Sequence, residues 1–205
     1  MKDSTRKIAV DVMGCDDGPR EAVEGALAAL NHVPDDILLV GPEKLIEPLL
    51  GQKHASSEQR ARIQIVPADD VVTMHDSPTE ALRKRNSSLF IAVEQVRNGE
   101  AFGLVSPGNT GATMATTKLR WRALPGVSRP AIATIIPAVD HQCVLIDVGA
   151  NVDCKPRHLL HFAIMGAVYA QEILRAKTPR VGLLSVGEEE SKGNALTAAT
   201  YEMLQ

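Results

Sequence analysis

The chain has 205 residues, enough for one sizeable domain or for one domain and part of another. Hydrophobic residues make up 44% and charged residues 23%, close to the globular average, so we expect a packed core. Aromatic residues make up only 3% and the formal net charge is −3. These values argue against aromatic platforms for single-stranded nucleic acid and against a general attraction to DNA, RNA or anionic lipid.

Short apolar runs rich in Val, Ile and Leu recur along the chain between helical patterns. Several of these runs are apolar at nearly every position, which is typical of strands covered on both faces in a parallel sheet. The expected strands are residues 8–12, 37–40, 63–66, 103–106, 131–136, 144–148 and 181–186.

Helical patterns occupy the stretches between these runs. The first, 19–30, has Pro19 in its first turn and apolar residues at helical spacing. The alternation of strands and helices predicts an α/β fold with a largely parallel sheet and helices on both faces, three layers in all. Composition marks no internal boundary, so residues 1–205 are predicted as a single domain. The other expected helices are 77–98, with a break near 86–88, then 109–120 and 156–175, while the polar stretch 51–62 is expected to be a surface connection.

The cysteines and the N-terminus predict a cytoplasmic protein. Cys15, Cys143 and Cys154 have no CxxC spacing, and an odd, scattered set is typical of reduced thiols in the cytosol. Residues 1–7 are polar and run straight into a strand, unlike a signal peptide, and no apolar run approaches the length of a membrane span.

Four loops that follow expected strands are dense in Gly, Asp, Asn and Ser, and in open α/β sheets ligands bind at such junctions. In the first, 11–19, Gly14 and Gly18 permit backbone angles closed to other residues. Asp11 and Asp16 are candidates to orient amides, hold a cation or position a ligand. The alternative is a tight turn in which an aspartate caps a helix.

The second loop, 106–112, has the features of an anion site. Two glycines let the backbone approach a ligand, and polar residues stand at a helix start whose free amides bind anions, so phosphate is the expected ligand. The GxxxxGK[ST] spacing of a P-loop is absent. The alternative is a well-capped helix after a strand. The candidate phosphate-binding residues are Ser106, Gly108, Asn109, Thr110 and Gly111.

The third loop, 147–156, brings Asp147, Asn151 and Asp153 to the end of a buried strand, with Lys155 as a flexible charge that reaches a phosphate. Two alternatives stay open. Asp153 only caps the following helix, or the carboxylates form a metal site with oxygen ligands from elsewhere.

The fourth loop, 185–194, places three glutamates, Glu188, Glu189 and Glu190, beside Lys192 and Asn194. Packing does not explain such a set in a glycine-bounded loop, so we expect a site. The alternative is a solvated charge run that opens the last helix.

Together the loops resemble the bacterial phosphate acyltransferases of phospholipid synthesis, the acyl-acyl carrier protein:phosphate transacylases. Five blocks carry the resemblance, in the order of the family and across nearly the whole chain: 11–19, 74–88, 106–112, 147–156 and 182–194.

The resemblance implies transfer of a long fatty acyl group from the thioester of acyl carrier protein to inorganic phosphate, giving acyl phosphate. It implies a fold similar to isocitrate dehydrogenase and phosphate acetyltransferase, a homodimer, and peripheral membrane contact through a C-terminal apolar helical region. Members of the family continue well past the position of Gln205, so the chain is expected to be C-terminally incomplete. Lys192 is the implied oxyanion donor, with the Asn194 amide assisting, or Lys192 neutralises the incoming phosphate.

Some residues depart from the family pattern or allow other interpretations. Cys15 stands where the family has a second glycine, and Pro107 replaces a small residue. An acyl-carrying Cys15 is disfavoured because no histidine is near it in sequence. The helical pair His158 and His161 is typical of surface or satisfied residues, so we predict no metal and no cofactor.

Acyl carrier protein is acidic, so its docking surface on this chain is expected to be basic. Two clusters are available, at 83–85 and at Lys118, Arg120 and Arg122, and either is also explained as a solvated helix face. Two other functions stay open: a coenzyme A-dependent short-chain phosphate acyltransferase, and a non-catalytic module that binds phosphate or dimerises.

Overall fold

The computed structural model describes residues 6–53, 55–187 and 192–205. Its contacts divide the chain into two compact units, the first ending at Arg122 and the second beginning at Ala123. Composition does not change at this point, which is why the sequence predicts no boundary there.

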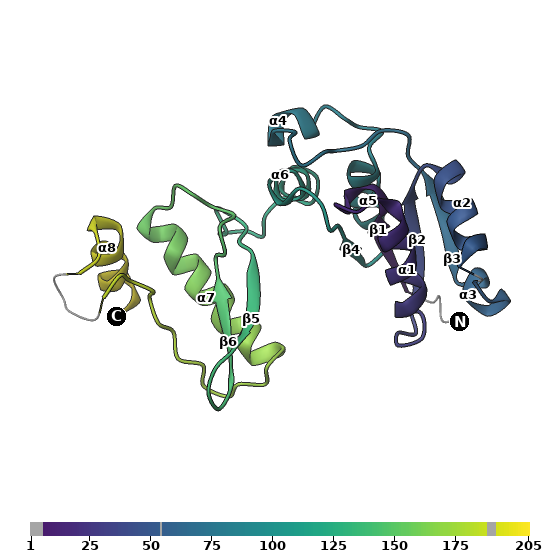
Figure 1. The fold of residues 1–205 in the computed structure, drawn as a ribbon. Coiled ribbons are helices and arrows are strands. Elements are labelled where there is room, and N and C mark those ends of the chain that lie inside the picture. Colours follow the sequence, from purple (N-terminus) through teal and green to yellow (C-terminus); the bar gives the residue numbers. More distant parts are fainter. Residues whose placement is uncertain (1–5, 54, 188–191) are drawn as a thin grey trace. The chain divides into compact units, whose positions relative to one another are not determined.

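The first unit is built on a four-stranded parallel sheet in the order β3–β2–β1–β4 (Figure 1). The chain passes from β1 to β2 and β3 on one side, and then returns to place β4 on the other side of β1. This arrangement confirms the largely parallel α/β sheet. The strands are β1 (Lys7–Asp11), β2 (Asp36–Gly41), β3 (Ile63–Pro67) and β4 (Gly103–Val105).

Helices cover both faces of this sheet, which completes the three predicted layers. Val10 and Leu39 point to a core shared with α1 and α2, whereas their neighbours Ala9 and Leu38 pack with Ala92 of α5. The alternation follows from the period of two along a strand. The helices of this unit are the 3-10 turn η1 (Val12–Gly14), α1 (Pro19–Ala29), α2 (Glu43–Gln52), α3 (Ser57–Ala61), α4 (Pro78–Ala81), α5 (Ser88–Arg97) and α6 (Thr110–Trp121).

Two helices of the first unit differ from the sequence prediction. Helix α2 was not among the expected helices, and it contains Pro48. Helix α3 lies in the stretch 51–62 expected to be a connection, and a capping box between Ser56 and Gln59 starts it. The expected break near 86–88 is longer than predicted, because α4 ends at Ala81 and α5 begins only at Ser88, where Ser87 accepts a hydrogen bond from the Phe90 amide as the cap.

The second unit contains an antiparallel hairpin of β5 (Ala133–Pro137) and β6 (Gln142–Ile146), followed by α7 (Pro156–Glu172) and α8 (Ala195–Leu204). Helix α7 packs on β6 and on α8. It approaches the hairpin at Gly166, where a Cβ atom would lie 3.1 Å from the side chain of Ile146.

The predicted strand 181–186 is wrong, because this stretch has no strand conformation. Leu184 is 81% exposed and Val186 is 86% exposed, and no described strand pairs with them. An apolar run forms a strand only where a neighbouring strand satisfies its backbone groups. Elsewhere, none of the helices in the described ranges combines the length and the apolar character required to cross a bilayer.

The fold predicts a clear contrast between two leucines of the first unit. Leu39 is fully buried in the central layer, so Leu39→Ala should lower the free energy of unfolding by about 2–5 kcal/mol. Leu45 on α2 is 45% exposed, and Leu45→Ala should change it by about 0.5 kcal/mol or less. Urea denaturation measures both. Equal losses would contradict the three-layer core.

Candidate functional site

The ends of β1 and β4 form the switch point of the sheet. The chain leaves β1 toward β2 on one side, while β4 lies on the other side. Loops at the carboxyl ends of two such neighbouring strands diverge and open a crevice, which is where open α/β sheets bind ligands. Here these loops are 11–19 and 106–112. The structure therefore brings the first two predicted loops together.

Gly14 and Gly108 are the point at which these two loops touch. A Cβ atom on Gly108 would lie 2.9 Å from the Cα and carbonyl oxygen of Gly14, and one on Gly14 would lie 3.0 Å from the Gly108 nitrogen. Real Cβ atoms do not approach backbone so closely. Gly14 was predicted for its backbone angles and Gly108 for close approach to a ligand, whereas here both allow two backbones to approach each other.

Asp11 joins the two strand ends through Ser106. Its side chain is 3% exposed, and Oδ2 accepts a hydrogen bond of 2.9 Å from the Ser106 hydroxyl. Oδ1 has no partner of standard hydrogen-bond geometry in the described part of the chain. Burial raises the pKa of Asp11 above its ordinary value, while hydrogen bonding to Ser88 and Ser106 opposes the rise. Asp11 is thus a buried link between the ends of β1 and β4 and does not face solvent.

Asn109 caps α6 and also holds a second segment. Its Oδ1 accepts from the Ala112 amide at 3.0 Å. Its Nδ2 donates to the carbonyl oxygens of Thr73 at 3.1 Å, Met74 at 3.4 Å and Asp76 at 2.9 Å. The side chain is therefore fully engaged, as the alternative of a well-capped helix requires.

The start of α6 still offers groups to an anion. The amides of Thr110 and Gly111 belong to the first turn of the helix and have no intrahelical acceptor. The Thr110 side chain is exposed, as is Asp16 in the loop after β1. A Cβ atom on Gly111 would meet only ordinary contacts at 3.5 Å, so packing does not require glycine at this position. Positive backbone dipoles at this helix end favour an anion.

In the third loop, Asp147 and Asn151 bind mainly to each other and to backbone. Asp147 accepts from the Ile132 amide at 3.0 Å, and from the Asn151 backbone amide and Nδ2 at 2.8 and 3.1 Å. Asn151 Nδ2 also donates to the Pro130 carbonyl at 2.9 Å. These hydrogen bonds fix the conformation of the loop after β6, which is a structural role.

Lys155 and Asp153 lie at the start of α7. The cap position is Lys155, so the alternative in which Asp153 only caps this helix is wrong. The Asp153 carbonyl instead accepts from Arg129 at 2.9 Å. Lys155 is exposed, and its backbone amide donates to His158 Nδ1 at 3.1 Å. Its charged side chain remains available to an anion.

The fourth loop is described only in part, because Glu188, Glu189, Glu190 and Ser191 lie outside the described residues. Lys192 is exposed and has no hydrogen bond or ion pair with any residue that the structure describes. Asn194 caps α8: its Oδ1 accepts from the Thr197 amide at 3.0 Å, and its own amide donates to Thr197 Oγ1 at 2.9 Å. The Asn194 side-chain nitrogen is the donor left for a ligand.

Sequence reasoning missed an ion pair in the block 74–88. Lys84 Nζ donates to Asp76 Oδ2 at 2.7 Å, and Asp76 also accepts from the Thr73 amide at 2.6 Å. In the other basic cluster, Arg120 makes a double hydrogen bond to Glu94 at 2.7 and 2.8 Å. One cation of each cluster is thus used inside the unit. The sequence contains no sign of these ion pairs, because a run of basic residues has the same pattern whether or not one of them is paired with a carboxylate.

Three other features do not alter this site. Burial, followed by the charge of Glu21, raises the pKa of the Cys15 thiol, which lowers the fraction of reactive thiolate at neutral pH. Among residues 6–53, 55–187 and 192–205, no three His, Cys, Asp or Glu side chains are grouped to hold a metal ion.

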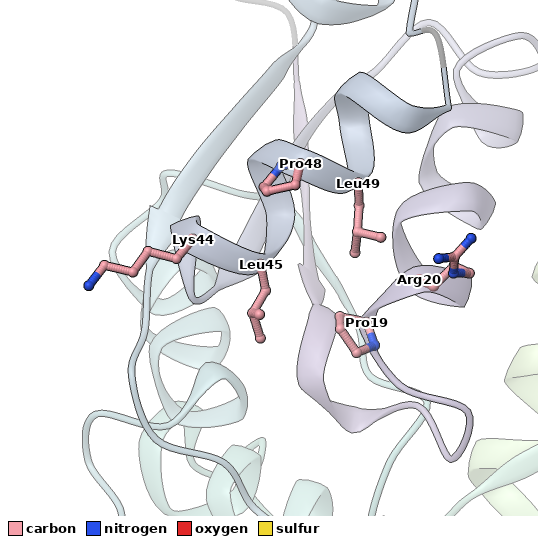
Figure 2. Close-up of a pocket in the computed structure, with 6 residues that line it drawn as sticks. All are labelled: Pro19, Arg20, Lys44, Leu45, Pro48 and Leu49. Carbon is pink, nitrogen blue, oxygen red and sulfur yellow. The ribbon is translucent and has the colours of Figure 1, made fainter.

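Between α1 and α2, a shallow, mainly apolar pocket of about 350 Å³ contains none of the predicted site residues. Figure 2 shows Leu45 and Leu49 extending from α2 into this pocket.

Comparison with known proteins identifies the family. The model of a family described as "Fatty acid synthesis protein" matches residues 6–205. Phosphate acyltransferases from Sulfurimonas denitrificans and Aquifex aeolicus are 47% identical over 200 residues and 49% identical over 199 residues. Each alignment covers 97% of this chain but only 59% and 58% of the relative. The chain therefore spans less than two thirds of the length of these relatives.

A solved structure supports the predicted fold. EutD phosphotransacetylase from Staphylococcus aureus matches with a TM-score of 0.66, covering 97% of this chain and 63% of the other. The sequence identity is 16%, so the likeness concerns the fold alone. It confirms the expected similarity to phosphate acetyltransferases.

The contact between the two loops predicts different effects at two glycines. Gly108→Ala places a methyl group against the Gly14 backbone and should cost about 1–3 kcal/mol of unfolding free energy. Gly111→Ala lies in a helix with free space and should be neutral, or should stabilise by about 0.5–1 kcal/mol. Thermal and urea denaturation compare the variants. If Gly108→Ala were as stable as Gly111→Ala, the close contact would be refuted.

The buried carboxyl group of Asp11 predicts a pH dependence. Because its pKa is raised in the folded protein, the stabilisation from its bound proton is complete below the ordinary value of 3.8 and is lost as the pH rises through the folded pKa. The unfolding free energy of Asp11→Asn should therefore increase relative to wild type across this window and then stay constant. Urea midpoints at a series of pH values measure the difference. A difference independent of pH would argue against the raised pKa.

Proposed function

The chain belongs to the fatty acid synthesis protein family, and on this premise we propose that it transfers an acyl group to inorganic phosphate. The proposed donor is a long-chain acyl-acyl carrier protein, and the product is an acyl phosphate for phospholipid synthesis. The observation that carries the proposal is the family match over residues 6–205, together with 47% and 49% identity to proteins named phosphate acyltransferase.

The start of α6 is the proposed phosphate cradle. Its support is the pair of first-turn amides at Thr110 and Gly111, next to the exposed Thr110 hydroxyl, at the switch point of the sheet. Asp11, Ser106 and Asn109 have a different task in this proposal. They are occupied by protein partners, so they shape the cradle rather than bind the anion.

The proposed chemistry is a direct acyl transfer. A phosphate oxygen attacks the thioester carbonyl carbon, a new C–O bond forms, and the carbonyl electrons move to an oxyanion. When that intermediate collapses, the C–S bond breaks and the carrier sulfur leaves as a thiolate. Because the conjugate thiol has a pKa of about 8.5, the step needs no strong general acid. Positioning the phosphate oxygen supplies much of the rate.

The oxyanion needs a preorganised donor, and Lys192 is our candidate, with Asn194 Nδ2 assisting. The support is that Lys192 is exposed and has no charge partner among the residues that the structure describes. The other proposed role, neutralising the incoming phosphate, uses the same ammonium group. Docking of acyl carrier protein is proposed on the exposed cations of the two basic clusters, Arg83, Arg85, Lys118 and Arg122. The homodimer and the membrane contact stay predictions.

The donor is tested by incubating the protein and inorganic phosphate with palmitoyl-acyl carrier protein, and separately with acetyl-coenzyme A. Acyl phosphate from the first donor alone supports the proposal. Acyl phosphate from the second alone would assign a coenzyme A-dependent short-chain enzyme instead. Phosphate binding by calorimetry without product from either donor would indicate a non-catalytic module.

Replacing Lys192 tests its proposed role. Loss of one oxyanion donor typically costs about 10²–10³ in kcat, so Lys192→Ala should reduce turnover by this order. Lys177→Ala is the matched control, because Lys177 is another exposed lysine of the second unit. Circular dichroism should show both variants folded. Turnover of Lys192→Ala equal to that of Lys177→Ala would remove Lys192 from the mechanism.

A further inference from the structure

The segment 71–77 is held against α6 almost entirely by polar contacts. Val72 is buried, at 7% exposure, but Thr73, His75 and Ser77 are exposed and Met74 is 56% exposed. Burial of apolar surface therefore fixes only one point of the segment. The rest of its conformation depends on hydrogen bonds.

Two side chains from outside the segment provide these bonds. Asn109 donates to three of its carbonyl oxygens, as described above. On the other side, Lys84 Nζ donates to the Val71 carbonyl at 2.8 Å and to Asp76 Oδ2 at 2.7 Å. Lys84 is thus turned toward the segment, and its ammonium group is not presented to a docking partner.

Asp76 connects the lysine to the backbone of the segment. Its Oδ2 accepts from the Thr73 amide at 2.6 Å and from the Thr73 hydroxyl at 3.1 Å, as well as from Lys84. The hydrogen bond from Lys84, followed by that from the Thr73 amide, lowers the pKa of Asp76, so this carboxyl group stays ionised at neutral pH. Charge-assisted bonds of this kind are stronger than neutral ones.

These contacts form a continuous path to the start of α6. Lys84 and Asp76 set the positions of the carbonyl oxygens of Thr73 and Asp76, and these oxygens orient the Asn109 side chain. Asn109 in turn caps the Ala112 amide, which leaves the amides of Thr110 and Gly111 as the outward donors. A substitution of Lys84 should therefore alter the start of α6 indirectly, through Asp76 and Asn109.

We propose that Lys84 and Asp76 are positioning residues of the phosphate site, which hold the segment 71–77 in the conformation that orients Asn109 and the first turn of α6. This inference rests on the proposed function, since it concerns the same cradle. On this proposal, the block 74–88 positions the phosphate site, and Lys84 is not part of the basic surface proposed for docking.

The test measures binding of inorganic phosphate by calorimetry in Lys84→Met, Asp76→Asn, the double variant and Lys84→Arg. Each of the first two should raise the Kd about tenfold, equivalent to about 1.4 kcal/mol. The Kd of the double variant should not exceed that of the weaker-binding single variant. The reason is that each substitution breaks the same chain of hydrogen bonds from Lys84 through Asp76 to Asn109. Lys84→Arg keeps the positive charge and the donor capacity, so it should bind phosphate more tightly than Lys84→Met.

Lys53→Met is the matched control. Lys53 pairs with Glu24 at 2.6 Å, and its side chain is 33% exposed against 29% for Lys84, but it lies at the end of α2. Its loss should leave the phosphate Kd unchanged. Hydrogen exchange should be faster in 71–77 for Lys84→Met and unaltered there for Lys53→Met.

The outcomes separate the two proposals. Wild-type protein that binds phosphate, with Lys84→Met binding equally well, would overturn the positioning inference and leave the proposed cradle standing. Unchanged hydrogen exchange in 71–77 would overturn the inference as well. If Lys84→Met fails to fold, Asp76→Asn and Lys84→Arg decide the matter by the same Kd comparison. Wild-type protein that binds no phosphate would refute the cradle itself.

Discussion

The backbone contact between Gly14 and Gly108 determines how the loops after β1 and β4 meet. Two side-chain-free residues allow the chains to touch, and Asp11 then bonds to Ser106 across the same junction. With the junction closed in this way, the chain that leaves β4 enters α6 at a defined point. Thr110 and Gly111, whose amides form the candidate cradle, follow this contact within three residues.

Most polar side chains predicted to bind a ligand are occupied by the protein itself. Asp11, Asn109, Asp147 and Asn151 each bond to backbone or to a neighbouring side chain. Such residues give a loop one conformation, which is what a binding site needs before a ligand arrives. The groups left for an anion are backbone amides and exposed cations. They are harder to recognise in a sequence than a run of Asp and Asn, because nearly every residue has a backbone amide.

Local features could be predicted from the sequence, and long-range partners could not. The apolar runs located β1 to β4, and the polar residues near 86–88 indicated an interruption before α5, because propensity and capping act over a few residues. The prediction of a strand at 181–186 was wrong because a strand also needs a neighbouring strand to pair with. The Lys84–Asp76 pair and the use of Gly14 and Gly108 depend on which loops meet, and that follows from strand order rather than from local pattern.

The two faces of the parallel sheet are packed with side chains of different size. Large residues such as Leu27, Leu39 and Ile46 fill the side of α1 and α2, whereas alanines are frequent on the side of α5, with Ala9 and Ala92 fully buried. Small side chains let α5 lie close to β1. As a result Ser88, the first residue of α5, reaches the carboxyl group of Asp11. The small side chains between α5 and β1 therefore bring a hydroxyl group of the helix to the carboxyl group that joins the ends of β1 and β4.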